Sequence, residues 1–326
     1  MKPQIVVIGA SAGGFEALRQ LFTELPGNLE ASFFVVLHIP ANSPSHLAKL
    51  LNNVSDLRVK NPENGEKIQK GYVYVAPPDR HLLVKQGFIR LYRGPRENRH
   101  RPAIDPLFRS AAVAYEAQVL GVIMTGFLDD GSSGLLAVKH CNGITMVQDP
   151  EDAQHPDMPR NAIAAVGEVD YQLPLDQMAS AIAKIVQQPN HKTSPIPENI
   201  KTEAAISERI FSDVPGTKTL GSLVPMSCPE CSGPLWQIDI DSVRRYRCHV
   251  GHGFTAKSLL NQQDKALEKA LWAAMRMMEE RSRLAFSMAE DENRKGRDKS
   301  AEIFYERAEE SRTHSQMLRK LLTDSN

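Results

Sequence analysis

A strand-like run of apolar residues leads into a glycine-rich turn near the amino end of the chain. The sequence reads IVVIGASAGGFEAL from Ile5, so Gly9, Ser11 and Gly13 fit the pattern G-x-S-x-G. That pattern holds a nucleophilic serine on a sharp turn between a strand and a helix. Small neighbours let the hydroxyl project above the carboxyl end of a sheet. The following helix directs its N-terminus at the site, so the N–H of Ala12 is a candidate oxyanion donor.

The same turn could instead cradle the pyrophosphate of a dinucleotide, as in an NAD(P) oxidoreductase. The G-x-G-x-x-G fingerprint, however, needs glycine where Ser11 stands, because backbone must approach the phosphates there. Short-chain dehydrogenases tolerate a Gly-Ala-Ser start but also need a Tyr-x-x-x-Lys pair, and no tyrosine of this chain has a lysine four residues on. The second apolar run ends in His38 rather than in a ribose-binding acid. The dinucleotide interpretation is therefore the weaker one.

A nucleophilic serine needs a base, and the base needs a group that orients it. His38 ends the apolar run VVLHIP, and Asp129 and Asp130 follow the run GVIMTG. Because parallel strands end at the same edge of a sheet, these side chains can meet Ser11 at one crevice. Taken singly, His38 could be a hydrogen-bonded rim residue, and Asp130 before Gly131 could be a turn residue or a helix cap. Their joint placement with the serine turn favours catalysis.

Three of the four cysteines cluster near the carboxyl end. Cys228 and Cys231 form a C-x2-C pair, and Cys248 follows after 16 residues in the string CHVGH. This spacing is typical of a zinc ribbon. A histidine must supply the fourth ligand, and His252 is preferred over His249 because Gly251 allows a Cys-x3-His turn. The alternatives are free thiols or a redox pair at Cys228 and Cys231.

The elements that position these residues alternate in a β-α rhythm over residues 1–187. Several apolar runs are continuous in Val and Ile, as in parallel strands buried on both faces. They predict an α/β fold with a doubly wound, mostly parallel sheet. The expected strands are 5–8, 33–39, 72–76, 119–124 and 144–148, and the expected helices are 15–25, 106–116, 133–140 and 175–187. The stretch 73–91, broken by two prolines and a glycine, predicts a small inserted hairpin.

Three further segments follow this first domain. Residues 188–223 are polar and proline-broken, which is typical of a linker with one short helical piece. Residues 224–261 hold the zinc-ribbon-like unit, which is too small to bury a good core unaided and so favours a bound metal. Residues 262–326 carry apolar side chains at helical spacing on both sides of Gly296 and predict a helical hairpin.

Composition bounds the partners. The chain has 326 residues, 41% of them hydrophobic, and its 39 Lys+Arg balance its 39 Asp+Glu. Nothing in that balance indicates a nucleic-acid partner. No apolar stretch approaches the ~20 residues that span a bilayer, so no membrane insertion is expected. The absence of a signal peptide and the metal-like cysteines predict a cytoplasmic location.

Six blocks of the first ~170 residues resemble, in the right order, the catalytic domain of the CheB family of chemotaxis protein-glutamate methylesterases. They are IGASAGGFEAL, VVLHIP, YVAPPDRHLLV, HRPAIDPLFRSAA, GVIMTGFLDDGSSGLLAVK and DAQHPDMPRNAI. The resemblance implies Ser11 as nucleophile, His38 as base and Asp130, which directly precedes a glycine, as its orienting partner. It also implies hydrolysis of glutamate methyl esters on a chemoreceptor or related signalling protein, with glutamine deamidation as a side activity. No catalytic cofactor is implied.

Two residues depart from the family pattern. Ala12 stands where threonine is frequent, and Leu128 stands where the family usually has glycine, which could reshape the pocket. The chain starts at the first catalytic strand, so no receiver domain is expected before it. The alternative is therefore a catalytically weak scaffold of the same fold that binds partners. The Cys/His unit and helices resemble an extension of some receiver-less family members, and this tail is expected to bind a partner or self-associate.

Overall fold

The computed structural model describes residues 4–44, 46–188, 195–208, 221–240 and 243–323. The chain divides into two compact units, Met1–Leu259 and Leu260–Asn326. The first unit holds the predicted α/β domain and the Cys/His unit, and the second holds most of the predicted helical hairpin.

A seven-stranded sheet forms the centre of the first unit, and every pairing in it is parallel. The strand order is β3-β4-β2-β1-β7-β8-β9. The burial of β1, β2 and β7 is complete, as their unbroken apolar sequences predict. The bounds are β1 Ile5–Ala10, β2 Ser32–Leu37, β3 Arg58–Lys60, β4 Tyr72–Val75, β7 Val119–Ile123, β8 Ile144–Gln148 and β9 Tyr171–Leu173.

The order in which the chain adds strands to the sheet reverses at β1, which pairs with β2 on one side and β7 on the other. Ala10 is level with Leu37, and Gly9 is level with both Val36 and Ile123. The three carboxyl ends therefore lie side by side at the point where the strand order reverses. In open α/β sheets this is the usual position of a ligand crevice.

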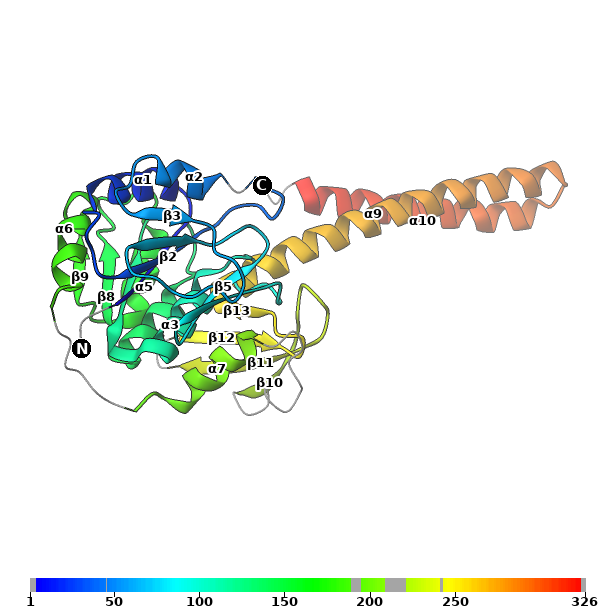
Figure 1. The fold of residues 1–326 in the computed structure, drawn as a ribbon. Coiled ribbons are helices and arrows are strands. Elements are labelled where there is room, and N and C mark those ends of the chain that lie inside the picture. Colours follow the sequence, from blue (N-terminus) through cyan, green and yellow to red (C-terminus); the bar gives the residue numbers. More distant parts are fainter. Residues whose placement is uncertain (1–3, 45, 189–194, 209–220, 241–242, 324–326) are drawn as a thin grey trace. The chain divides into compact units, whose positions relative to one another are not determined.

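Helices cover both faces of the sheet (Figure 1). One face packs against α1, α2 and α6, whose apolar stripes bury side chains such as Leu18 and Ile182. The other packs against α3, α4 and α5 through Leu107, Leu135 and Met158 among others. The bounds are α1 Gly14–Glu24, α2 Leu47–Asn52, α3 Ile104–Tyr115, α4 Ser132–His140, α5 Asp157–Val166 and α6 Leu175–Ile185.

The inserted hairpin is present but shorter than predicted. It consists of β5 (His81–Lys85) and β6 (Phe88–Tyr92), which form a separate two-stranded antiparallel sheet. The residues before it form β4 of the main sheet, because Val73 pairs with Phe33 of β2. The expected strands and helices all occur, with ends shifted by a few residues.

The Cys/His unit is a four-stranded antiparallel sheet of order β10-β11-β12-β13. Its strands are β10 Ser222–Ser227, β11 Pro234–Ile240, β12 Val243–Cys248 and β13 Gly253–Thr255. We call this sheet with its connecting turns the ribbon. A buried contact of Ile238 with Leu136 of α4 packs the ribbon against the α/β domain.

Part of the predicted linker is ordered against the domain. Helix α7 (Glu198–Glu208) packs on α3 and buries Ile200, whereas 189–194 and 209–220 lie outside the described residues. Helix α7 also carries Glu203, whose side chain is fully buried.

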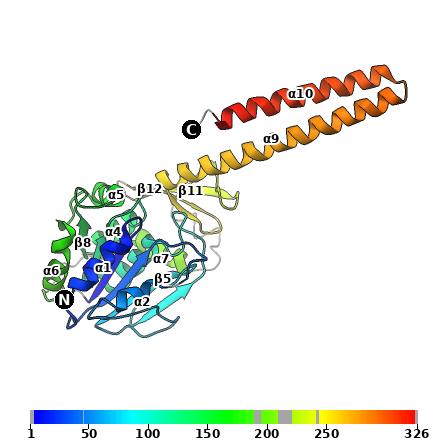
Figure 2. The same ribbon diagram turned by 90° about the horizontal axis from the view of Figure 1, so that it is seen from above.

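Helix α9 (Ala256–Arg294) begins in the first unit. From Leu260 on, it forms the helical hairpin of the second unit with α10 (Asp298–Thr323), joined by a turn with Gly296 at φ +69° (Figure 2). Phe286 packs edge-on against Tyr305, and Arg319 pairs with Glu279 across the two helices. Helix α9 begins at Ala256, six residues before the predicted start. Among the described residues, no helix combines the length and apolar character needed to span a membrane.

Candidate active site

Ser11 lies on the turn between β1 and α1. Its N–H donates to the Thr125 carbonyl (3.0 Å), and its own carbonyl accepts from Gly14 (2.9 Å). Gly13 has φ +73°, a conformation that glycine adopts without strain. A Cβ on Gly126 would lie 2.7 Å from the Ser11 Cβ, so this glycine permits the close approach of the two turns.

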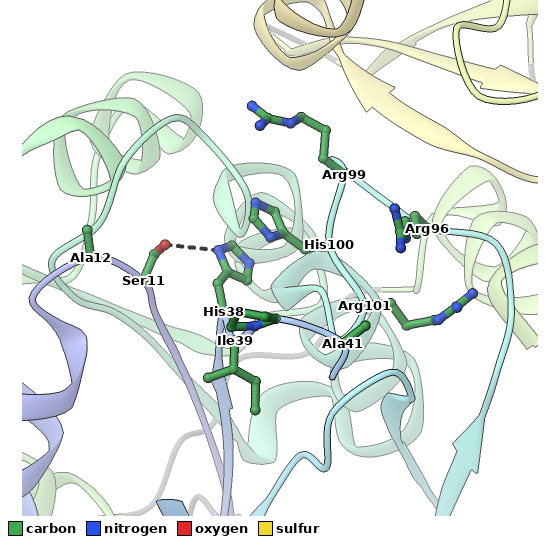
Figure 3. A pocket seen from close by; sticks show the side chains of 10 residues that line it. Ser11, Ala12, His38, Ile39, Ala41, Arg96, Arg99, His100 and Arg101 are labelled. Atoms are coloured by element: carbon green, nitrogen blue, oxygen red, sulfur yellow. Dashed lines mark hydrogen bonds between the residues drawn. The ribbon is translucent and has the colours of Figure 1, made fainter. Parts of the chain in front are cut away.

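The side chains of Ser11, His38 and Asp130 form a continuous hydrogen-bonded relay. His38 Nδ1 lies 3.1 Å from Ser11 Oγ, as drawn in Figure 3, and His38 Nε2 lies 2.7 Å from Asp130 Oδ2. The side chains of His38 and Asp130 are only 5% and 3% exposed. The structure therefore brings together the three residues that the sequence singled out.

Asp130 is held as a carboxylate by its surroundings. Oδ2 also accepts from the Ile104 N–H (2.7 Å), and Oδ1 accepts from the Asn98 amide (2.9 Å) and the Asp105 N–H (3.3 Å). Burial opposes the charge, but the hydrogen bond and charge of His38 together with these donors lower the pKa of Asp130 to about 2. An ionised Asp130 accepts a hydrogen bond from the Nε2–H group of His38, so the Nδ1 lone pair of His38 faces the Ser11 hydroxyl.

Asp129 occupies a different environment from its neighbour. Its Oδ1 accepts a hydrogen bond from Thr255 Oγ1 of the ribbon (2.9 Å), and burial raises its pKa. No hydrogen bond joins it to His38 among the described contacts. The structure thus distinguishes two adjacent acids that the residue pattern alone left open.

A second buried carboxylate lies beside Asp130. Asp105 Oδ1 accepts from the N–H groups of Gly131 (3.1 Å) and Gly134 (2.6 Å), so it caps the start of α4. Burial and the neighbouring Asp130 raise the pKa of Asp105 to about 7. The Asn98 amide lies between the two acids and donates to Asp105 Oδ2 (2.8 Å) as well as to Asp130.

His100 stacks on His38 with ring centroids 3.6 Å apart and planes 3° from parallel. Burial and the positive charge that His38 can carry lower the pKa of His100 to about 3, so its ring is neutral at physiological pH. The stacked ring fixes the plane of His38 without adding a competing charge.

A pocket of about 510 Å³ opens in front of Ser11 and His38 (Figure 3). Its far wall is the loop that carries Arg96, Arg99, His100 and Arg101. Arg101 is engaged by Asp79, whereas Arg96 is exposed. The arrangement offers a nucleophile and a base at one end of the pocket and positive charge at the other.

Leu128 has a left-handed backbone conformation, which glycine adopts without strain. Its φ is +64°, in the left-handed region that disfavours a branched side chain by roughly 1–2 kcal/mol. Its carbonyl accepts a hydrogen bond from Asn161 Nδ2 (2.7 Å), which holds the loop.

The pKa of Asp130 gives a test on stability. A pKa below that of the unfolded chain, about 3.9, means that ionised Asp130 stabilises the fold above that pH and that this contribution is lost as the pH falls toward 2. Between pH 5 and pH 2.5, we expect the unfolding free energy of the wild type to fall by about 2 kcal/mol more than that of Asp130→Asn. Urea unfolding at pH 5 and pH 2.5 measures this. The exposed Asp56→Asn should keep the wild-type difference, and an equal loss in both variants would refute the assignment.

The three cysteines and His252 of the ribbon converge on one point. Their ligand atoms all lie within 4.8 Å of one another, with Cys231 Sγ 3.7 Å from Cys248 Sγ and His252 Nδ1 3.4 Å from Cys248 Sγ. His249 is outside this group. Cys141, by contrast, is a buried apolar residue at the end of α4.

Comparison with known protein families gives one match to the α/β domain. The family model described as CheB methylesterase matches residues 6–182. The chain belongs to the CheB methylesterase family.

Named relatives share the α/β domain. A Rhizobium johnstonii protein-glutamate methylesterase/protein-glutamine glutaminase is 40% identical over 182 residues, which cover 55% of this chain and 49% of the relative. A Leptospira interrogans protein that carries the same name provisionally is 39% identical over 188 residues, covering 57% and 97%. The chain thus spans about half the length of the first relative and nearly all of the second.

A solved structure gives the same extent. The crystal structure of the Thermotoga maritima CheB methylesterase catalytic domain aligns with a TM-score of 0.54 at 35% identity, covering 57% of this chain and 99% of that one. The family match ends at residue 182, before the ribbon and the helical hairpin.

Sequence reasoning missed three residues of the site: Asn98, His100 and Asp105. Each contacts Asp130 or His38 from a loop or helix start far along the chain. The block HRPAIDPLFRSAA contains two of them, but nothing in its spacing shows that it folds over the strand ends.

Proposed function

We propose that this protein is a protein-glutamate methylesterase that hydrolyses γ-methyl esters of glutamate side chains on a methylated chemoreceptor or related signalling protein. The observation that carries the proposal is the buried relay in which His38 contacts Ser11 and Asp130 with its two ring nitrogens. Membership of the family and the names of its relatives support the same activity.

The reaction proceeds through a covalent intermediate. Ser11 Oγ attacks the ester carbonyl while His38 Nδ1 accepts its proton, and the Ala12 N–H stabilises the developing oxyanion. The proton passes to the departing methoxide, so that methanol leaves and a glutamyl ester remains on Ser11. A water molecule, deprotonated by His38, then releases glutamate. Glutamine would follow the same route with ammonia as the leaving group.

Methanol release from a methylated receptor fragment tests the function. The full chain should release methanol and convert the methylated residues to glutamate, with the positions confirmed by peptide mass spectrometry. A fragment carrying glutamine at those positions should be converted more slowly. The scaffold alternative predicts binding of the fragment without methanol release, so that outcome would refute the proposal.

The ribbon is proposed to hold one structural zinc ion through Cys228, Cys231, Cys248 and His252. In a tetrahedral site the Zn–S and Zn–N lengths require ligand separations of about 3.5–3.8 Å. The separations of 3.7 Å between two sulfurs and of 3.8 Å between sulfur and Nδ1 fall in that range, and a third, of 3.4 Å between sulfur and Nδ1, lies just below it. Four protein ligands fill every position, so the metal would stabilise the fold and take no part in ester hydrolysis. Thiolate ligands are consistent with a reducing, cytoplasmic location.

Metal analysis of two matched histidine variants tests this ligand set. We expect about one zinc per chain in the wild type and in His249→Ala, and a loss in His252→Ala because three ligands bind zinc far more weakly. Elemental analysis after dialysis against a weak chelator gives the stoichiometry. Zinc retained by His252→Ala but lost from His249→Ala would exchange the roles of the two histidines.

A further inference from the structure

The loop from Arg96 to Arg101 lies between the pocket and the ribbon. Arg96, Arg99, His100 and Arg101 line the pocket in front of Ser11. The two remaining residues, Glu97 and Asn98, are only 1% and 2% exposed. Both are held by residues of the ribbon, which lies beyond residue 182, where the family match ends.

The backbone of this loop is joined to the ribbon sheet. The Asn98 N–H donates to the Gly253 carbonyl (2.8 Å), and the Gly253 N–H donates to the Arg96 carbonyl (3.3 Å). Asn98 and Arg99 have φ +48° and +75°. Such left-handed backbone persists only where its surroundings hold it, and here the first strand residue of β13 does so.

A buried ionic cluster fixes the loop further. Glu97 pairs with Arg109 of α3 (2.5 Å) and with Arg247 of β12 (3.1 Å), and Arg245 lies at 3.4 Å. Arg245 also binds Glu203 of α7 at 2.6 Å through both carboxylate oxygens. Removing one partner from such a cluster leaves a buried charge uncompensated, so the cluster forms only when loop, ribbon and α7 are together.

Asn98 contacts both the ribbon and Asp130. Its Nδ2 donates to Asp130 (2.9 Å) and Asp105 (2.8 Å). Its Oδ1 accepts from the Thr255 N–H (3.0 Å) and lies 3.2 Å from Ser258 Oγ. Ser258 in turn is 1% exposed.

The two ends of this amide cannot be exchanged. A flipped amide would direct Oδ1 at two carboxylates and Nδ2 at the donors of Thr255 and Ser258. The donors of Thr255 in the ribbon and Ser258 at the start of α9 therefore select the orientation in which Nδ2 faces Asp130. The hydrogen bond from Nδ2 helps to place the carboxylate against His38.

We propose that Asn98 is a positioning residue that couples the ribbon to the orientation of Asp130, so that the folded ribbon is a working part of the esterase site. The proposal rests on the proposed function, since Ser11 must be a nucleophile for the coupling to have a chemical consequence. In this proposal the ribbon acts on the esterase site of its own chain.

The test measures how fast Ser11 reacts with a fluorophosphonate, which needs the relay but no knowledge of the receptor. The probe forms a phosphorus–oxygen bond to Ser11 and releases fluoride, while His38 takes the hydroxyl proton. In the zinc-loaded full chain, Ser258→Ala should slow the reaction about fivefold and Asn98→Asp about 100-fold at neutral pH. Ser222→Ala, at an exposed serine of the ribbon, should react as the wild type does.

A pH series and a double variant separate positioning from a general loss of structure. Lowering the pH should restore part of the rate of Asn98→Asp relative to wild type, because a protonated carboxyl again has a proton to donate to Asp130. Adding Ser258→Ala to Asn98→Asp should cost little more, since the link is already cut. Zinc content and thermal unfolding of each variant identify proteins that have lost the ribbon itself.

Three results would overturn the proposal: a wild-type rate in a folded, zinc-loaded Ser258→Ala, additive losses in the double variant, or a pH-independent loss in Asn98→Asp. Removing zinc from the wild type should slow labelling of Ser11, and readdition should restore it; a metal-free protein labelled at full rate also contradicts the coupling. A wild type that does not react with the probe at all would instead refute the proposed function.

Discussion

Ser11→Ala should lower kcat for methyl ester hydrolysis by about 10⁴- to 10⁶-fold. The loss is large because the variant has no atom that can form the acyl-enzyme, although the pocket and the Ala12 N–H remain. KM should change little, since the hydroxyl contributes to the reacting bond rather than to ground-state binding. Steady-state methanol release with a methylated receptor fragment measures both constants.

The exposed Ser180 on α6 provides a matched control for this substitution. Its hydroxyl bonds only to the carbonyl of Gln177 in the same helix, so Ser180→Ala should keep wild-type kinetics. Ser11→Ala should also melt at the wild-type temperature, because its backbone bonds to Thr125 and Gly14 do not involve the side chain. Unchanged turnover in a well-folded Ser11→Ala would remove Ser11 from the mechanism.

Asp130→Asn is the second substitution with a large expected effect, about 10⁴-fold in kcat. Each carboxylate oxygen of Asp130 accepts two hydrogen bonds, so all four polar groups in contact with the carboxylate are donors. An amide NH2 must then face either Asn98 or His38. If it faces His38, the ring places its proton on Nδ1 and no longer has a lone pair for the Ser11 hydroxyl.

Asp129→Asn separates this effect from a general loss of charge. Asp129 contacts the ribbon through Thr255 and not His38, so its amide variant should lose less than about tenfold. Comparable kcat values for the two variants, or a greater loss in Asp129→Asn, would contradict the assignment of Asp130 as the acid that orients His38.

The sequence predicts the main sheet because each strand is a local apolar run and each crossover a local helical pattern. Ser11, His38 and Asp130 could be named because parallel strands bring their carboxyl ends to one edge. The choice between Asp129 and Asp130 came from the family resemblance, and the hydrogen bond to His38 agrees with it.

Other features depend on contacts that no local pattern encodes. Asn98 and His100 act through a loop that bridges the domain and the ribbon. Glu203, in a polar stretch interpreted as linker, is buried because Arg245 and Arg247 lie opposite it. Helix α5 was missed for a related reason, since a proline and polar residues mask its short apolar face. The left-handed backbone of Leu128 runs against the preference of its own side chain.

Titration with a fluorophosphonate, followed by methanol release and by mass spectrometry of the peptide that contains Ser11, tests the central claim most directly. The account predicts that activity falls in proportion to the fraction of Ser11 modified and reaches zero at one label per chain. Full methanol release from protein whose Ser11 is completely modified would contradict it, as would inactivation with the label on another residue.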